Sequence, residues 1–165
     1  MATVTGTNGR DSLNGTNLVD QIFGRGGNDT LIGFGGDDTL EGGAGADELF
    51  GSVGFDYASY KSSPTSVIVS LQGFYAANGD AEGDHLYSIE GLVGSRFNDA
   101  LFGDDQRNVL RGGGGVDDLY GLEGNDRLEG GAGTDNLEGG AGADELLGGN
   151  GLDTASYANS LEAVR

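Results

Sequence analysis

The sequence predicts an all-β fold, a parallel β-roll of the β-helix or solenoid type, and three observations carry this prediction. Glycine supplies 35 of the 165 residues, about three times its average usage of roughly 7%. The glycines recur with a nine-residue period over most of the chain. Each period holds one large apolar residue at a fixed place, which is enough for a thin core between two sheets but not for a centred globular core.

The nine-residue units form two arrays, residues 6–59 with six units and residues 94–156 with seven. The first position is Gly in all thirteen units, the fourth is Gly in ten, and the sixth is Asp in twelve, with Asn108 as the exception. The eighth position is Leu or Ile in eleven units, and Ala58 and Ala155 occupy it in the last unit of each array. The chain is therefore one small motif used many times.

Each unit divides into a short strand and a turn. Successive side chains of a strand point to opposite faces, so the eighth-position side chain points inward while its two neighbours point outward. The other six residues must reverse the chain, and we expect the glycines at positions one and four to supply positive φ there. Two units then complete one coil, which places each sixth-position Asp beside the Asp of the unit two further on.

This stacking brings acidic side chains into register and predicts a cation. Two carboxylates at the strand spacing of about 4.7–4.9 Å repel by roughly 3 kcal/mol at an effective dielectric near 20. Calcium takes ~6–8 oxygens from carboxylates and backbone carbonyls, so it would relieve the repulsion. Nine such pairs with one ion each would nearly cancel the formal charge of −19, which suggests about eight or nine ions. The predicted metal ligands are Asp11, Asp20, Asp29, Asp38, Asp47, Asp56, Asp99, Asn108, Asp117, Asp126, Asp135, Asp144 and Asp153.

Departures from the motif predict which of these sites bind calcium more weakly. Leu18, Phe97 and Gln106 replace the fourth-position Gly, and Asn108 offers a neutral amide oxygen in place of a carboxylate, so the sites beside them should be weaker. The strongest expected pairs are Asp29/Asp47, Asp38/Asp56, Asp117/Asp135, Asp126/Asp144 and Asp135/Asp153.

The pattern resembles the repeats-in-toxin (RTX) family, whose haemolysin-type calcium-binding nonapeptide is G-G-x-G-x-D-x-U-x. The resemblance covers the thirteen units, 117 of 165 residues. It implies a parallel β-roll of two short sheets with calcium in the turns along both edges. It also implies secretion by a type I exporter to the extracellular space, where calcium would fold a stabilising and interaction module of a larger protein. The alternatives are a non-catalytic carbohydrate-binding module, alginate-like in its ligand, of a secreted polysaccharide enzyme, and an adhesin fragment.

Residues 60–93 interrupt the repeat and are expected to be a strand-and-loop insert continuous with the roll. Apolar residues alternate from Val67 to Leu71, which predicts a strand with one buried face, and Val67 falls at the eighth position if the first array continues. Counting back from Gly94, Leu92 and Glu90 occupy the eighth and sixth positions of a degenerate unit.

The middle of this insert, residues 72–84, is expected to be a protruding loop that absorbs the change of phase between the arrays. Its acidic run from Asp80 to Asp84 lacks the Gly and Glu of an EF-hand loop at the required places. The sequence leaves open whether these residues bind an extra ion or form a solvated acidic loop.

Composition and single residues exclude several other functions. A net charge of −19 disfavours nucleic acid and anionic membranes as partners, and no apolar run is long enough for a membrane span. There is no Cys and a single His, His85, so the usual catalytic triads and zinc sites cannot be assembled. We expect His85 to be a plain loop residue, the basic residues to be scattered, and the protein not to be an enzyme.

Two further expectations concern the ends of the arrays. Tyr57, Tyr60 and Tyr157 follow the last units and are expected to cap the ends of the thin core. Residues 153–164 repeat the sequence pattern of residues 56–67, so residues 157–165 should begin a further, truncated unit. We therefore expect other domains of a longer parent chain as partners.

Overall fold

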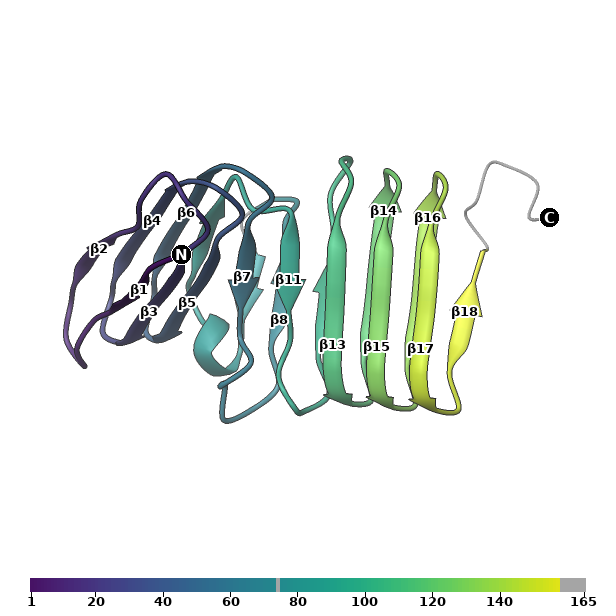
Figure 1. Ribbon diagram of the computed structural model, residues 1–165. Helices are drawn as coiled ribbons and strands as arrows, with labels where there is room; N and C mark the ends of the chain where they lie inside the picture. Colours follow the sequence, from purple (N-terminus) through teal and green to yellow (C-terminus); the bar gives the residue numbers. More distant parts are fainter. Residues whose placement is uncertain (74, 158–165) are drawn as a thin grey trace.

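In a computed structural model that describes residues 1–73 and 75–157, the chain winds into a parallel β-solenoid (Figure 1). Two sheets face one another across a thin core, and the turns line both edges. The described residues contain no α-helix, and their one helical segment is the 3₁₀ turn η1 (Gly79–Ala81). None of their helical segments has the length and apolar character of a membrane span.

One face of the roll is an eight-stranded parallel sheet that runs through both arrays. Its strands pair in the order β1-β3-β5-β7-β11-β13-β15-β17. It holds β1 (Thr3–Thr5), β3 (Gln21–Gly26), β5 (Thr39–Ala44), β7 (Tyr57–Ser59), β11 (Gly91–Val93), β13 (Val109–Gly115), β15 (Arg127–Gly133) and β17 (Glu145–Gly151).

The opposite face is divided into two sheets. The four-stranded sheet holds β2 (Ser12–Asn14), β4 (Thr30–Gly35), β6 (Glu48–Val53) and β10 (His85–Tyr87). The six-stranded sheet holds β8 (Ile68–Ser70), β9 (Tyr75–Ala77), β12 (Ala100–Phe102), β14 (Asp118–Glu123), β16 (Asn136–Ala141) and β18 (Thr154–Ser156). In Figure 1 the strands of the first array are inclined to those of the second, and the division between the two sheets lies where the inclination changes.

Many strands are longer than the three-residue segments expected from the motif. Strand β3 pairs with β5 not only from Gln21 to Phe23 but also through Arg25 and Gly26, which lie in the following turn. The same extension gives six or seven residues to most strands within the arrays. Neighbouring turns are therefore in backbone register with one another as well as neighbouring strands.

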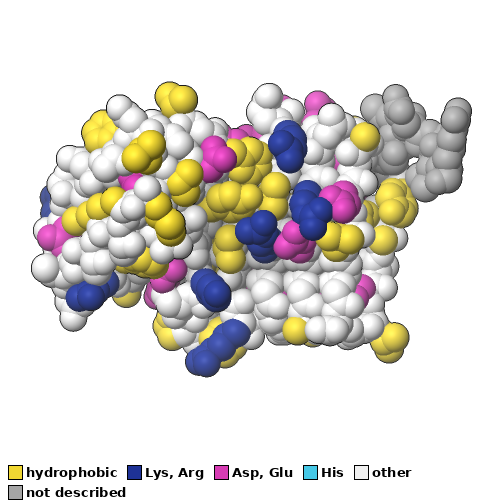
Figure 2. Space-filling model, in the orientation of Figure 1, with side chains coloured by type: hydrophobic (Ala, Val, Ile, Leu, Met, Phe, Trp, Pro, Cys, Tyr) yellow, Lys and Arg dark blue, Asp and Glu magenta, His cyan; other side chains and the backbone are white. Residues whose placement is uncertain are grey.

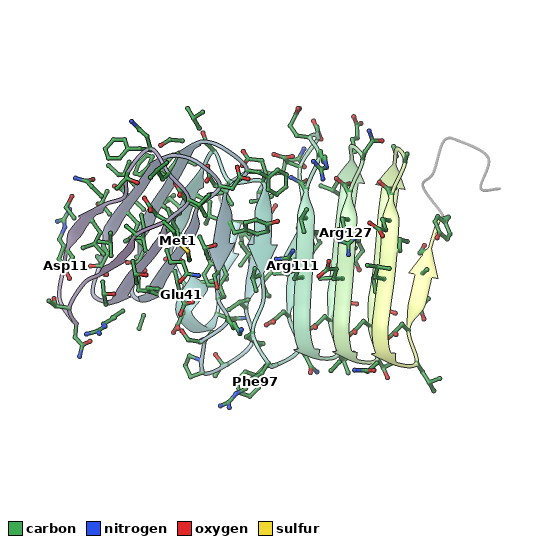
Figure 3. The ribbon with its side chains drawn as sticks, viewed as in Figure 1. Met1, Asp11, Glu41, Phe97, Arg111 and Arg127 are labelled. Atoms are coloured by element: carbon green, nitrogen blue, oxygen red, sulfur yellow. The ribbon has the colours of Figure 1, made fainter. Side chains whose placement is uncertain are left out.

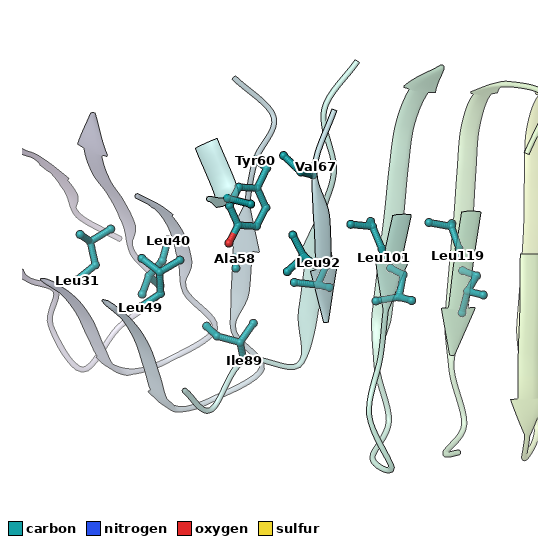
Figure 4. Packing of buried hydrophobic residues seen from close by; sticks show 14 of the residues in the cluster. Leu31, Leu40, Leu49, Ala58, Tyr60, Val67, Ile89, Leu92, Leu101 and Leu119 are labelled. Atoms are coloured by element: carbon teal, nitrogen blue, oxygen red, sulfur yellow. The ribbon is translucent and has the colours of Figure 1, made fainter. Parts of the chain in front are cut away.

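The core is a file of eighth-position side chains along the axis of the roll (Figure 4). Parallel pairing sets Ile22 opposite Leu40 and Leu110 opposite Leu128, so each layer rests on the next. Burial of one such side chain contributes roughly 1.5–3 kcal/mol, and the file repeats that contribution at each coil. The eighth-position members that are at most 2% exposed are Ile22, Leu31, Leu40, Leu49, Ala58, Leu101, Leu110, Leu119, Leu128 and Leu137.

The insert forms a joint between the arrays. After β7 the chain enters β8, reverses into the antiparallel strand β9, passes through η1 and returns as β10 on the edge of β6. Strand β11 then lies between β7 and β13. Residues 72–84 are therefore not simply a protruding loop, because β9 and η1 fall within them.

The nine-residue phase changes earlier in the chain than the expected residues 72–84. Val69, not Val67, pairs with the eighth-position Leu101, so a shift of two residues has already occurred before β8. Both valines are buried. The degenerate unit 85–93 is as predicted in register, since Leu92 pairs with Ala58 on one side and Leu110 on the other.

Tyr60 fills the interior of the joint and does not cap an exposed end. It is 1% exposed and belongs to the core cluster with Val67 and Leu92 (Figure 4). Tyr57 is partly buried in β7, and Tyr157 is 46% exposed.

His85 lies in strand β10, not in a loop. The expected unit 157–165 lies outside the described residues except for Tyr157.

Candidate metal centre

A ladder of aspartates joins the turns of successive coils. The Oδ1 atom of most sixth-position aspartates accepts a hydrogen bond from the backbone N–H of the sixth-position residue one coil earlier, as in Asp38 N–H to Asp56 Oδ1 at 2.7 Å and Asp117 N–H to Asp135 Oδ1 at 3.0 Å. One oxygen of these carboxylates is therefore held by the neighbouring backbone. The expected picture of carboxylates that simply face one another is incomplete for this reason.

The ladder continues across the joint, although the repeat does not. Asp47 N–H donates to Asp84 Oδ1 at 2.8 Å, and Asp56 N–H donates to Glu90 Oε2 at 2.8 Å. Glu90 was predicted to hold a sixth position, but Asp84 was missed. The signal for it is the stretch GDAEGDHLY at residues 79–87, which has Gly first, Asp sixth and Leu eighth.

The second carboxylate oxygen behaves differently from the first. In seven members of the ladder, Oδ2 is completely buried and has no hydrogen-bond donor. A buried charged oxygen without a partner is costly, so these atoms mark places suited to a positive group. Within residues 1–73 and 75–157, the unpartnered oxygens are Oδ2 of Asp29, Asp38, Asp47, Asp56, Asp117, Asp126 and Asp135.

The first-position glycines make room for these oxygens. A Cβ on Gly130 would lie 2.5 Å from Asp135 Oδ2 and 2.6 Å from the carbonyl oxygen of Gly148, the first residue of the unit one coil further on. Both oxygens thus converge on the space that the missing side chain leaves. Space, and not positive φ, explains the invariance of Gly at this position, which corrects the expectation.

Positive φ occurs at positions two and four, where it allows the turn to reverse. Gly131 and Gly133 adopt φ values of 109° and 153° in one such turn. Position two accepts other residues in this conformation, with φ between 72° and 79°, at a cost of order 1–3 kcal/mol each. The residues other than glycine there are Arg25, Phe34, Ser52 and Leu122.

The electrostatics of the ladder disfavour charge on the metal-free turns. Burial raises the pKa of Asp38, Asp47 and Asp126 to about 6 and the pKa of Asp117 to about 7. Asp20 is an exception, because the hydroxyl of Thr16 bonds to its carboxylate and lowers its pKa. Without a cation, burial therefore makes these four carboxyls easier to protonate in the fold than in the unfolded chain.

The donor set that remains suits a hard cation. Within the described part of the chain, no three Asp, Glu or His side chains come together as a metal cluster, so carboxylates alone do not make a site. In the middle of an array, an unpartnered Oδ2 and a main-chain carbonyl of the next coil instead border the same space beside a first-position glycine, as Asp135 Oδ2 and the Gly148 carbonyl do beside Gly130. Carboxylate and carbonyl oxygens are the ligands that calcium takes.

These features define a class of protein: a parallel β-solenoid whose turns present buried, unpartnered oxygens suited to calcium. A comparison with protein families places the chain within that class. The RTX calcium-binding nonapeptide repeat (4 copies) matches residues 3–31, 14–49, 23–58, 93–128 and 120–155, which is well over half of the chain. The chain therefore belongs to the RTX calcium-binding nonapeptide repeat family. No curated protein matches it in a sequence search.

Proposed function

We propose that this RTX β-roll is a module that folds when it binds calcium and then stabilises a larger extracellular protein. The observation that carries the proposal is the row of seven buried, unpartnered Oδ2 atoms in the described turns. The family is a structural, calcium-binding one, and we infer no catalytic role for the chain.

The coupling of folding to calcium follows from the cost of those oxygens. The folded turns bury carboxylates that water would otherwise solvate, and a bound divalent cation replaces that solvation. Because the unfolded chain has no preformed site, the free energy of binding becomes free energy of folding. Extracellular calcium modules bind with dissociation constants of ~10⁻⁴–10⁻³ M, so a chain of this kind would stay unfolded during export and fold outside the cell.

Circular dichroism of the purified chain tests this proposal. In excess chelator at neutral pH we expect the spectrum of an unfolded chain, and millimolar calcium should produce the β signal cooperatively. Magnesium should fail, since it prefers a rigid octahedral shell and keeps its waters. A well-formed β spectrum in chelator at neutral pH would contradict the proposal.

One surface supports the alternative function of binding an acidic polysaccharide. A hollow of about 730 Å³ on the eight-stranded sheet is lined by Lys61, Arg96 and Arg111, with Glu129 beside them. Figure 2 shows basic side chains gathered on this face, and Figure 3 shows Arg111 near Arg127 on it. The basic residues are thus less scattered than expected. A gel shift with a polyuronate such as alginate would separate this function from a purely stabilising one.

A further inference from the structure

The turns of the roll are of two kinds, and the ninefold pattern does not distinguish them. In nine units both the second and the fourth residue have positive φ, and we call these turns open. Their carboxylates receive no hydrogen bond from their own turn. The open turns begin at Gly24, Gly33, Gly42, Gly51, Gly112, Gly121, Gly130, Gly139 and Gly148.

The other four turns are closed by hydrogen bonds to the sixth-position side chain. The backbone N–H of Thr16 donates to Asp20 Oδ2 at 2.6 Å, and the Thr16 hydroxyl donates to the same oxygen at 2.7 Å. The backbone N–H of Ser95 donates to Asp99 Oδ2 at 2.5 Å, and its hydroxyl lies 3.0 Å from that oxygen. The remaining closed turns follow the same pattern, with Thr7 N–H to Asp11 Oδ2 at 2.6 Å and Asp104 N–H to Asn108 Oδ1 at 2.8 Å.

The fourth residue explains three of the four closed turns. Open turns have Gly there with φ from 101° to 158°, a range that side chains rarely adopt. Leu18, Phe97 and Gln106 occupy the fourth position in three closed turns and have no positive φ. A hydroxyl at position two does not close a turn by itself, since Ser52, followed by Gly54, lies in an open one.

We propose that the four closed turns bind no calcium, because their own N–H and hydroxyl groups already occupy the oxygen that a cation would need. This inference rests on the proposed calcium-dependent function and adds which turns carry it out. Seven ions, one for each buried unpartnered Oδ2 in the described residues, replace the eight or nine expected from pairing alone. The open turns at Gly139 and Gly148 are not counted, because the described residues contain no next coil that could complete a site with Asp144 or Asp153.

Two of the seven sites lie at the joint, where the repeat pattern predicts none. Asp47 and Asp56 have unpartnered Oδ2 atoms, and the next coil supplies Asp84 and Glu90 as their ladder partners. Asp56 Oδ2 and the carbonyl of Ser88 both border the space beside Gly51, so the Ser88 carbonyl takes the place of the first-position carbonyl of a regular unit. In contrast, Asp84 Oδ2 accepts the hydroxyl of Tyr60 at 3.1 Å, so it offers no further site.

The number of bound ions tests the inference, measured by elemental analysis of the calcium-saturated chain after desalting. We expect seven ions for the unaltered chain. Asp20→Asn, in a closed turn, should leave seven, and its matched variant Asp38→Asn, in the open turn one coil further on, should leave six. The loss of an ion in Asp20→Asn, or more ions than the nine open turns, would overturn the distinction between turns while leaving calcium binding intact. No bound calcium at all would overturn the proposed function as well.

A second pair of variants tests the cause of closure. The double substitution Thr16→Gly with Leu18→Gly removes the hydroxyl and permits positive φ at both positions, so the ion count should rise from seven to eight. Ser52→Gly alters an already open turn and should leave seven. A count of seven in the double variant, with an unchanged circular dichroism spectrum in calcium, would contradict the assignment of closed turns.

Discussion

The sixth-position aspartate has two functions in the fold, and each carboxylate oxygen serves one of them. Oδ1 links coils by accepting the N–H of the preceding Asp, as in Asp29 N–H to Asp47 Oδ1 at 2.7 Å. Oδ2 is buried without a donor in seven of the nine open turns. Asn108 keeps its place in the ladder through its backbone N–H, which donates to Asp126 Oδ1 at 2.8 Å, while its side-chain Oδ1 accepts the N–H of Asp104 in its own turn.

Gly130→Ala tests the space that first-position glycine provides. The new Cβ would lie within 2.6 Å of two oxygens, so we expect the calcium-bound chain to lose roughly 1–3 kcal/mol of stability and to bind calcium more weakly. Urea denaturation in saturating calcium measures the loss. Gly9→Ala is the matched control, because the nearest atom to its Cβ is 4.0 Å away, and its effect should stay within about 0.5 kcal/mol. Equal effects of the two variants would refute this explanation.

Stability depends on the stacking of coils, because each coil buries only two apolar side chains. These side chains are covered by the apolar side chains of the neighbouring coils. Leu119 pairs with Leu101 on one side and Leu137 on the other. The joint keeps this stacking with different residues, since Tyr60, Val67 and Leu92 fill the space between the two arrays. A continuous file of side chains therefore passes through both.

Leu119→Ala should be strongly destabilising for this reason. The side chain is fully buried, and such truncations cost about 2–5 kcal/mol, with little scope for collapse in a core one side chain thick. Thermal unfolding in saturating calcium measures the effect. Leu152→Ala, at a position 83% exposed, should change stability by less than about 0.5 kcal/mol. A small effect at Leu119 would show that the file does not act as the core.

At the scale of the whole molecule, acidic charge and fold oppose one another. The formal charge of −19 repels itself in any compact state, and the ladder places part of that charge in buried turns. Divalent cations and protons are two ways of removing it. Both therefore stabilise the same fold, and they compete for the same carboxylates.

The metal-free chain should consequently be more stable in acid than at neutral pH. Burial raises the pKa of Asp38 to about 6 and of Asp84 and Asp117 to about 7 in the fold, so the folded state holds protons more tightly than the unfolded state. This stabilisation is fully present below the ordinary pKa near 3.8 and is lost as the pH rises through about 6 to 7. In chelator, the β signal in circular dichroism should therefore be stronger at pH 5 than at pH 7.5.

Saturating calcium should reverse that dependence, because the ligands must be deprotonated to bind it. The urea midpoint of the calcium-bound chain should then rise over the same interval. A metal-free β signal that increases with pH would contradict the proposed effect of the buried carboxyls.

The sequence by itself determined the roll, its period, its thin core and the choice of calcium. These follow from local rules, since one apolar residue and one aspartate in nine residues can be satisfied only if neighbouring units stack. It also predicted the register of Glu90 and Leu92, because they keep the frame of Gly94.

Only the tertiary structure decided which turns are open, where the joint changes phase, and that Asp84 joins the ladder. These depend on backbone dihedral angles and on contacts between residues far apart in the chain, such as Tyr60 with Asp84. A periodic pattern records which residue stands at a position. It does not record which donors reach that residue once the coils have stacked, and those donors determine whether an aspartate has an oxygen left for a cation.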